Sequence, residues 1–234
     1  MKRWLLLLAP ALLVGCTPTE TVDSTELPTS DIYPEIEVVA DSGSSTVTVE
    51  LRVGDEDSND YVELQGGDRL EATAGGDTKT LSGSGSRYRA TFDVDGAGTE
   101  FEIAFLRSGD DDDATETSVV LPDPFRLSVD VAESSRSIGV DVPFRWEPVE
   151  EDSDLEVYWY IEGNCILDED GETEDDGEAV IDASQIQTLP ANAQASCSVD
   201  LAVSRRQPGQ IDRAFGGGTI RAAQRRHTTF ISSP

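Results

Sequence analysis

The chain has 234 residues and carries 47 Asp and Glu against 17 Lys and Arg, which gives a formal net charge of −30. This charge argues against a nucleic-acid partner, because phosphate contacts need clustered Lys and Arg. It also disfavours a position flat on an anionic lipid surface. The length suits one large domain or two small ones.

The N-terminus has the pattern of a secretory signal. Lys2 and Arg3 form a positive n-region, and residues 4–14 form an apolar run. That run is shorter than the roughly 20 residues of a membrane-spanning helix, so we expect residues 1–15 to be a cleaved signal peptide. The four residues Leu13-Val14-Gly15-Cys16 resemble the lipobox of bacterial lipoproteins.

The lipobox resemblance implies a membrane anchor. Cys16 would receive fatty acyl chains, palmitate among them, and become the N-terminus of the exported protein. Two or more such chains hold a protein stably on a bilayer. Thr17 stands where an aspartate would resemble the inner-membrane retention signal, which implies the cell outer membrane, on its periplasmic or surface-exposed face. An ordinary secretory signal with an incidental cysteine is the alternative.

Residues 16–32 are predicted to be a lipidated, flexible tether. The segment is rich in Thr, Pro, Ser and acidic residues and has no apolar periodicity. Such a composition is typical of a disordered segment.

Residues 33–121 predict a first β-sandwich. The stretch TVTVELRV at residues 46–53 alternates apolar and polar side chains, which is the period of a half-buried strand. Strands are expected at 35–40, 46–53, 61–64, 69–72, 88–94, 101–106 and 118–121, separated by Gly-, Asp- and Ser-rich turns.

Pro122-Asp123-Pro124 interrupts this pattern and predicts a domain boundary, because proline cannot donate a hydrogen bond to a sheet. Residues 122–234 then predict a second β-sandwich. Its strands are expected at 125–131, 137–146, 155–162, 179–186, 197–204 and 219–231.

The second block resembles fibronectin type III-like domains. VPFRWEPVEEDSDLEVYWYI, at residues 142–161, is similar to the strand of that family that ends in Trp-x-Pro and the aromatic strand after it. The resemblance implies two tandem immunoglobulin-like or fibronectin type III-like sandwiches, an all-β fold. Cys197 departs from the family, because it stands near the place of the corner tyrosine. We expect Trp146 and Trp159 in the core, with exposed stacking platforms for sugars as the alternative.

Two kinds of bound or covalent site are candidates. Cys165 and Cys197 form an even pair in an exported chain and predict a disulfide, with a reduced pair as the alternative. In the stretch GDEDSND, four oxygen-bearing side chains could converge on calcium, or the stretch could be a solvated acidic turn. These four residues are Asp55, Asp57, Asn59 and Asp60.

Catalysis finds little support in the sequence. His227 is the single histidine, and no nucleophile turn, phosphate loop or zinc motif accompanies it. A group of arginines near the C-terminus could bind an anion or pair with carboxylates across strands. Its members are Arg205, Arg206, Arg213, Arg221, Arg225 and Arg226.

The functional prediction is a non-enzymatic, lipid-anchored envelope protein that acts in binding, adhesion or assembly. Its expected partners are the membrane, through the anchor, and a protein or glycan; no cofactor is expected unless calcium binds. A calcium-dependent adhesion module is the alternative, and a hydrolase that uses acidic residues is the third possibility.

Overall fold

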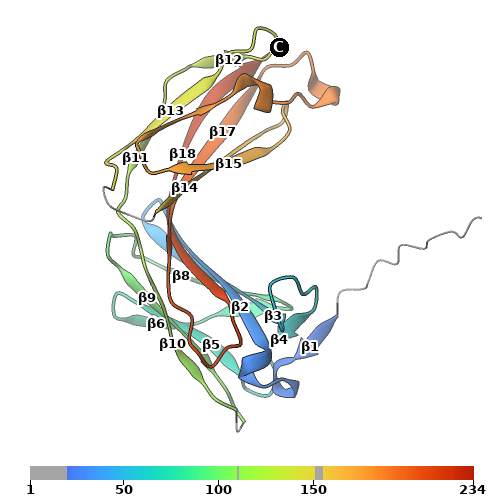
Figure 1. The fold of residues 1–234 in the computed structure, drawn as a ribbon, viewed down its shortest axis with the longest axis vertical. Coiled ribbons are helices and arrows are strands. Elements are labelled where there is room, and N and C mark those ends of the chain that lie inside the picture. The colour runs from blue at the N-terminus through green and yellow to red at the C-terminus, as the bar shows by residue number, and fades with distance from the viewer. Residues whose placement is uncertain (1–19, 110, 151–154) are drawn as a thin grey trace, which may run out of the picture.

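The computed structural model describes residues 20–109, 111–150 and 155–234 (Figure 1). Over these residues the chain is all-β, as predicted, and its strands form an eleven-stranded, a four-stranded and a three-stranded sheet. No helix in this part of the chain is long and apolar enough to span a membrane. The helices are short 3₁₀ turns: η1 (Ser24–Glu26), η2 (Thr29–Asp31), η3 (Ala183–Gln185) and η4 (Pro190–Asn192).

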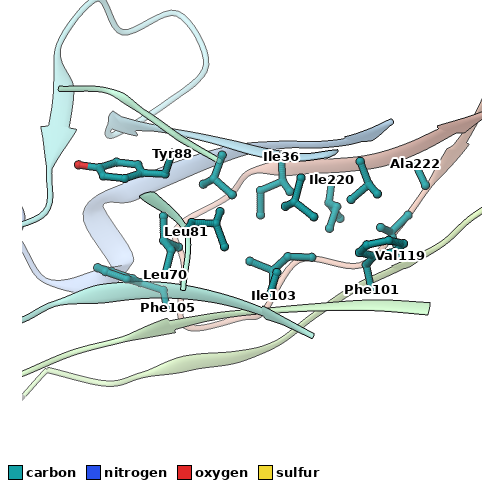
Figure 2. Close-up of a cluster of buried hydrophobic side chains, with 14 of the residues drawn as sticks. Ile36, Leu70, Leu81, Tyr88, Phe101, Ile103, Phe105, Val119, Ile220 and Ala222 are labelled. Atoms are coloured by element: carbon teal, nitrogen blue, oxygen red, sulfur yellow. The ribbon is translucent and has the colours of Figure 1, made fainter. Parts of the chain in front are cut away.

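The first sandwich packs one half of the large sheet against the four-stranded sheet. The large-sheet strands are β1 (Thr21–Asp23), β2 (Ile32–Asp41), β3 (Ser44–Val53), β4 (Tyr61–Glu63), β7 (Ser82–Ser84) and β8 (Arg87–Phe92). The opposing sheet has the order β10 (Ala114–Val120), β9 (Glu100–Leu106), β5 (Arg69–Ala74) and β6 (Asp77–Thr80). Figure 2 shows the apolar side chains of the two sheets meeting between them.

Alternation along β3 explains this packing. Val47, Val49 and Leu51 are fully buried, whereas Thr46, Thr48 and the other intervening residues face outward. Burial of each such side chain contributes about 1.5–3 kcal/mol to the free energy of folding, relative to leaving it exposed. The predicted face of this strand is therefore confirmed.

The second sandwich packs the other half of the large sheet against the three-stranded sheet. The large-sheet strands are β12 (Glu133–Ser135), β14 (Glu156–Gly163), β15 (Glu169–Glu174), β17 (Cys197–Pro208) and β18 (Thr219–Ser233). The opposing strands are β11 (Arg126–Val129), β13 (Val142–Glu147) and β16 (Glu178–Ile181). Trp146 and Trp159 lie in this core, 2% and 5% exposed, as predicted.

A single long strand joins the two sandwiches. β18 pairs with β17 along most of its length, and its first half also pairs in parallel with β2, Thr219 opposite Glu35 through Gln224 opposite Ala40. The hairpin β17–β18 therefore extends out of the second sandwich and along the edge of the first (Figure 1). The large sheet is continuous across both.

The tip of this hairpin completes the first core. Phe215 stacks on Phe105 with ring centroids 5.9 Å apart, and Ile220 and Ala222 lie in the same cluster. A Cβ at Gly216 would collide with the carbonyl oxygen of Ser30, so the tip needs a glycine there. The predicted boundary at residue 122 separates the first run of strands from the second, but residues 209–224 of the predicted second range pack on the first sandwich.

The predicted tether is shorter than residues 16–32. Residues 16–19 lie outside the described part, but residues 20–32 fold against the first sandwich, and β1 pairs in parallel with β4. The buried hydroxyl of Ser24 donates to Asp68 at 2.9 Å. The prediction was wrong here because a polar network, which leaves no apolar periodicity in the sequence, holds the segment.

Arg107 is the centre of that network. Its side chain is 2% exposed and pairs with Asp68 at 3.0 Å. It also donates to the hydroxyl of Thr29 and to the carbonyls of Ser24 and Leu27. Burial alone would raise the pKa of Asp68, but hydrogen bonds from Ser108 and Ser24, together with Arg107, lower it below its ordinary value. The fully hydrogen-bonded pair of Arg107 and Asp68 thus holds residues 20–32 against the first sandwich.

Candidate binding face

The outer surface of the continuous sheet forms the inner side of an arc. Figure 1 shows the two sandwiches curving around the side where β2, β18, β17 and β14 lie. The smaller sheets lie on the outer side of the arc. We call this surface the concave face. It consists of the outward side chains of β2, β18, β17 and β14: Glu35, Glu37, Val39, Asp41, Arg221, Ala223, Arg225, His227, Arg206, Ser204, Ala202, Asp200, Tyr158, Tyr160 and Glu162.

Strand register fixes how these side chains are arranged. One row across the sheet places Arg225 opposite Ser204, which is opposite Tyr158. The next row places His227 opposite Ala202, which is opposite Tyr160. Small residues in the middle and tyrosines on one side leave room above the sheet.

Two depressions occupy this space and share Arg225. The first, of about 250 Å³, is lined by residues of β14, β17 and β18, among them Tyr160 and His227. The second, of about 290 Å³, lies over β2, β3 and β8 and includes Glu37 and Arg89. The concave face is therefore hollowed on both sides of the junction between the sandwiches.

His227 links the two sandwiches across this junction. Its Nδ1 lies 2.9 Å from Asp200 of β17, and its Nε2 lies 3.3 Å from Asp41 at the end of β2. Both ring nitrogens therefore face carboxylates. Among the described residues this arrangement gives the histidine no nucleophile to activate, so it lacks the geometry of a hydrolase triad.

The tyrosines of β14 are held as neutral hydrogen-bond donors. A hydrogen bond to Asp168, with partial burial, raises the pKa of Tyr160 to about 12. Burial and a hydrogen bond to Asp170 raise the pKa of Tyr158. Both tyrosines therefore stay neutral at physiological pH.

Arg206 lies over one of these rings. Its guanidinium carbon is 3.9 Å from the centroid of Tyr158, a cation–π contact. Burial, followed by the charge of neighbouring Arg221, lowers the pKa of Arg206. The two guanidinium groups are thus close enough to repel each other.

Arg205 belongs to the interior and not to the face. Its side chain is fully buried and pairs with Asp175 at 2.8 Å. It also donates to the carbonyls of Asp123 and Pro148, which lie in the segment between the sandwiches and after β13. The sequence left two alternatives for these arginines: binding of an anion, or pairing with carboxylates. Arg205 pairs with a carboxylate, whereas Arg206, Arg221 and Arg225 lie on the concave face.

The last two predicted arginines lie elsewhere. Arg226 donates to the carbonyl of Phe125 on the opposite side of β18. Arg213 is exposed in the hairpin tip. The six arginines of the C-terminal region therefore do not form one patch.

The predicted disulfide is confirmed, and the predicted calcium residues do not converge. Cys165 and Cys197 are joined with their Cα atoms 5.8 Å apart. In GDEDSND, Asp55 accepts from the backbone of Asp57, and Asp60 accepts from the backbone of Glu20. The described residues contain no group of three or more acidic, His or Cys side chains arranged to hold a metal ion.

The other predicted site residue, Cys16, lies outside the described residues. Asn59 remains in the turn after β3 with the rest of its stretch. The concave face was not predicted, because its residues are far apart in sequence. The pairing of β18 with β2, which brings them together, left no signal in the pattern of either strand.

Comparison with known proteins assigns no family to the chain. No family model matches the chain, and no curated protein matches it in sequence. The adhesin InvE of Yersinia pseudotuberculosis is 14% identical over 86% of this chain and 59% of its own, with a TM-score of 0.24. The FN1–FN3 domains of chicken CNTN1 are 13% identical over 92% of this chain and 65% of their own, with a TM-score of 0.30.

A segment of two fibronectin type III domains from chicken tenascin is 12% identical over 86% of this chain and 99% of its own, with a TM-score of 0.25. The chain spans less than two thirds of the first two structures. Similarities at this level leave the function to be argued from the molecule itself. The fold itself is all-β, as predicted, with two tandem sandwiches that share one sheet.

Proposed function

We propose that the protein is a non-enzymatic binding module that is anchored in the outer membrane by lipid on Cys16 and binds its partner through the concave face. The observation that supports this most directly is the hollowed surface around Arg225, where depressions from the two sandwiches adjoin. Binding surfaces of proteins are typically concave and carry a few placed polar groups.

The contacts on this surface fit binding better than catalysis. His227 is held between two carboxylates, and the tyrosine hydroxyls donate to acids. Cys165 and Cys197 form a disulfide and supply no thiolate. A surface of fixed side chains on a rigid sheet positions a ligand without needing to change it.

The anchor and the face call for separate experiments. Labelling cells with radioactive palmitate should mark the wild-type protein and leave Cys16→Ser unlabelled. Equal labelling of both would contradict the anchor.

For the face, the wild-type protein and an Arg225→Glu variant are compared in a pulldown from solubilised envelope. Arg225 has one hydrogen bond, from its Nε to Ser204 at 3.2 Å, so this change removes little folding energy. Partners should be lost from the variant and retained by Arg213→Glu, which places the same charge on the hairpin tip. Equal recovery by both variants would refute a role for the concave face.

A further inference from the structure

The arginines of this acidic chain fall into two groups. Six of them have a carboxylate oxygen within 3.3 Å, as expected when acidic residues are so abundant: Arg52, Arg69, Arg87, Arg107, Arg145 and Arg205. On the concave face the pattern differs. Within the described residues Arg221 and Arg225 have no ion pair, and Arg206 reaches Glu172 only at 3.9 Å.

These arginines and Arg89 of β8 form a strip, which we call the arginine strip. Arg89 lies opposite Thr48, which lies opposite Glu37, which lies opposite Arg221. Arg89 also has no ion pair in the described part of the chain, and it lines the same depression as Arg225. The other arginines without a close carboxylate lie off this face, where Arg136 and Arg226 donate to backbone carbonyls.

The length of the strip favours a chain-like ligand. Arg221 and Arg225 are four residues apart on β18, which corresponds to roughly 13 Å at 3.3 Å per residue. Arginine side chains placed this far apart along a strand can each contact a different anionic group. The guanidinium groups of Arg221 and Arg225, with Arg206 beside them, suit a ligand whose negative charges recur at intervals.

The surroundings of the strip favour a glycan over an acidic peptide. The backbone groups of β2, β18 and β17 are already paired within the sheet, so the face offers no strand edge to a peptide. Asp200 and Glu162 line the same depression as Arg225, and they offer carboxylate oxygens to neutral hydrogen-bond donors. The same carboxylates accept hydrogen bonds from sugar hydroxyls, and Tyr160 offers a ring to stack on a sugar.

We propose that the arginine strip binds an anionic glycan, a polysaccharide that carries carboxylate groups at intervals. The proposal rests on the concave face being the binding surface. Arg206, Arg221 and Arg225 bind the carboxylates, while Asp200, Glu162 and Tyr160 contact the uncharged parts of the sugars.

The test measures binding of three hexasaccharides to the full-length protein held by its anchor in a supported bilayer. The probes are hexagalacturonate, its carboxyl-reduced neutral form, and a heparin hexasaccharide that carries sulfate. We expect binding of hexagalacturonate and roughly a tenfold or greater loss in Arg221→Gln/Arg225→Gln, because charge-assisted hydrogen bonds are removed. The matched control is Arg126→Gln/Arg213→Gln, which removes the same charge from exposed positions off the face and should bind within about twofold of wild type.

Each outcome decides the proposal. Preference for heparin over hexagalacturonate, with the same loss in the double variant, overturns the carboxylate-bearing glycan in favour of a sulfated one. Equal binding of the reduced hexasaccharide overturns the role of charge. No binding of any probe overturns the glycan, whereas the pulldown with Arg225→Glu reports separately on whether the face binds a partner. Should the double variant unfold, Arg221→Gln alone serves, because the side chain of Arg221 has no hydrogen bond or ion pair to lose in the described structure.

Discussion

Replacing Phe215 by alanine tests whether the two sandwiches fold as one unit. Phe215 is 7% exposed at the tip of the β17–β18 hairpin and stacks on Phe105 of the first sandwich. Truncating a buried phenylalanine costs about 3–5 kcal/mol. The loss arises in the first core, although the residue belongs to the hairpin of the second.

The two sandwiches can be followed separately during unfolding. Of the three tryptophans, Trp146 and Trp159 lie in the second core and Trp4 in the predicted signal peptide. Tryptophan fluorescence in a Trp4→Phe background therefore reports on the second sandwich, and far-ultraviolet circular dichroism reports on both. If the shared sheet couples the two sandwiches, Phe215→Ala lowers the urea midpoints of fluorescence and of dichroism equally. The expected shift is about 1 M, for a loss of about 3 kcal/mol in the free energy of unfolding and a urea dependence near 3 kcal/mol/M.

The refuting result is specific. An unchanged fluorescence midpoint in Phe215→Ala, with a lowered or split dichroism transition, would show that the sandwiches unfold independently. Ile138→Ala is the control. Ile138 is 76% exposed in the second sandwich, and its removal should change the free energy of unfolding by less than about 0.5 kcal/mol.

Three further predictions concern stability. Replacing Cys165 and Cys197 by serine should cost roughly 3–4 kcal/mol, because the disulfide closes a loop of sequence separation 32; a urea midpoint equal to wild type would contradict this. Asp212→Asn should destabilise the protein at neutral pH, since burial raises the pKa of Asp212 but the N–H groups of Ala214, Glu116 and Thr115 outweigh it and lower the pKa below 3.8. Because its pKa is lowered in the folded state, ionised Asp212 stabilises the protein at pH values above its ordinary pKa, and this stabilisation is lost as the pH falls through the lowered value. The melting temperatures of mutant and wild type should therefore converge in acid. A gap that stays constant with pH would refute the assignment. Calcium and magnesium at equal ionic strength should raise the melting temperature equally, by screening the acidic chain, and a shift specific to calcium would revive a site in GDEDSND.

Much of the fold was predictable from local pattern. The alternation in residues 46–53 predicts β3, and the paired cysteines predict the disulfide. β15, with the sequence EDGETE, lies outside the expected strands because it contains no strand-favouring apolar residue. Its Gly171 is the cross-strand partner of Trp159, and a Cβ there would come within 2.5 Å of the indole ring, so this position needs a glycine.

The concave face was harder to predict because it depends on register between distant strands. Nothing in residues 219–224 distinguishes a strand that pairs with β2 from one that ends in a loop. The buried charges are equally hidden, since Arg205 and Arg107 resemble surface arginines in sequence. Their burial follows from carbonyl and carboxylate partners that the fold brings to them.

The pairing of β18 with β2 has a consequence for the order in which the chain becomes native during synthesis. Synthesis of β2 ends 178 residues before the strand that covers its edge begins, since β2 ends at Asp41 and β18 begins at Thr219. Until then the nascent first sandwich has an open strand edge and an incomplete core around Phe105. Open edges are templates for wrong pairing, so a chain truncated shortly before residue 219 should bind chaperones more strongly than the finished protein does.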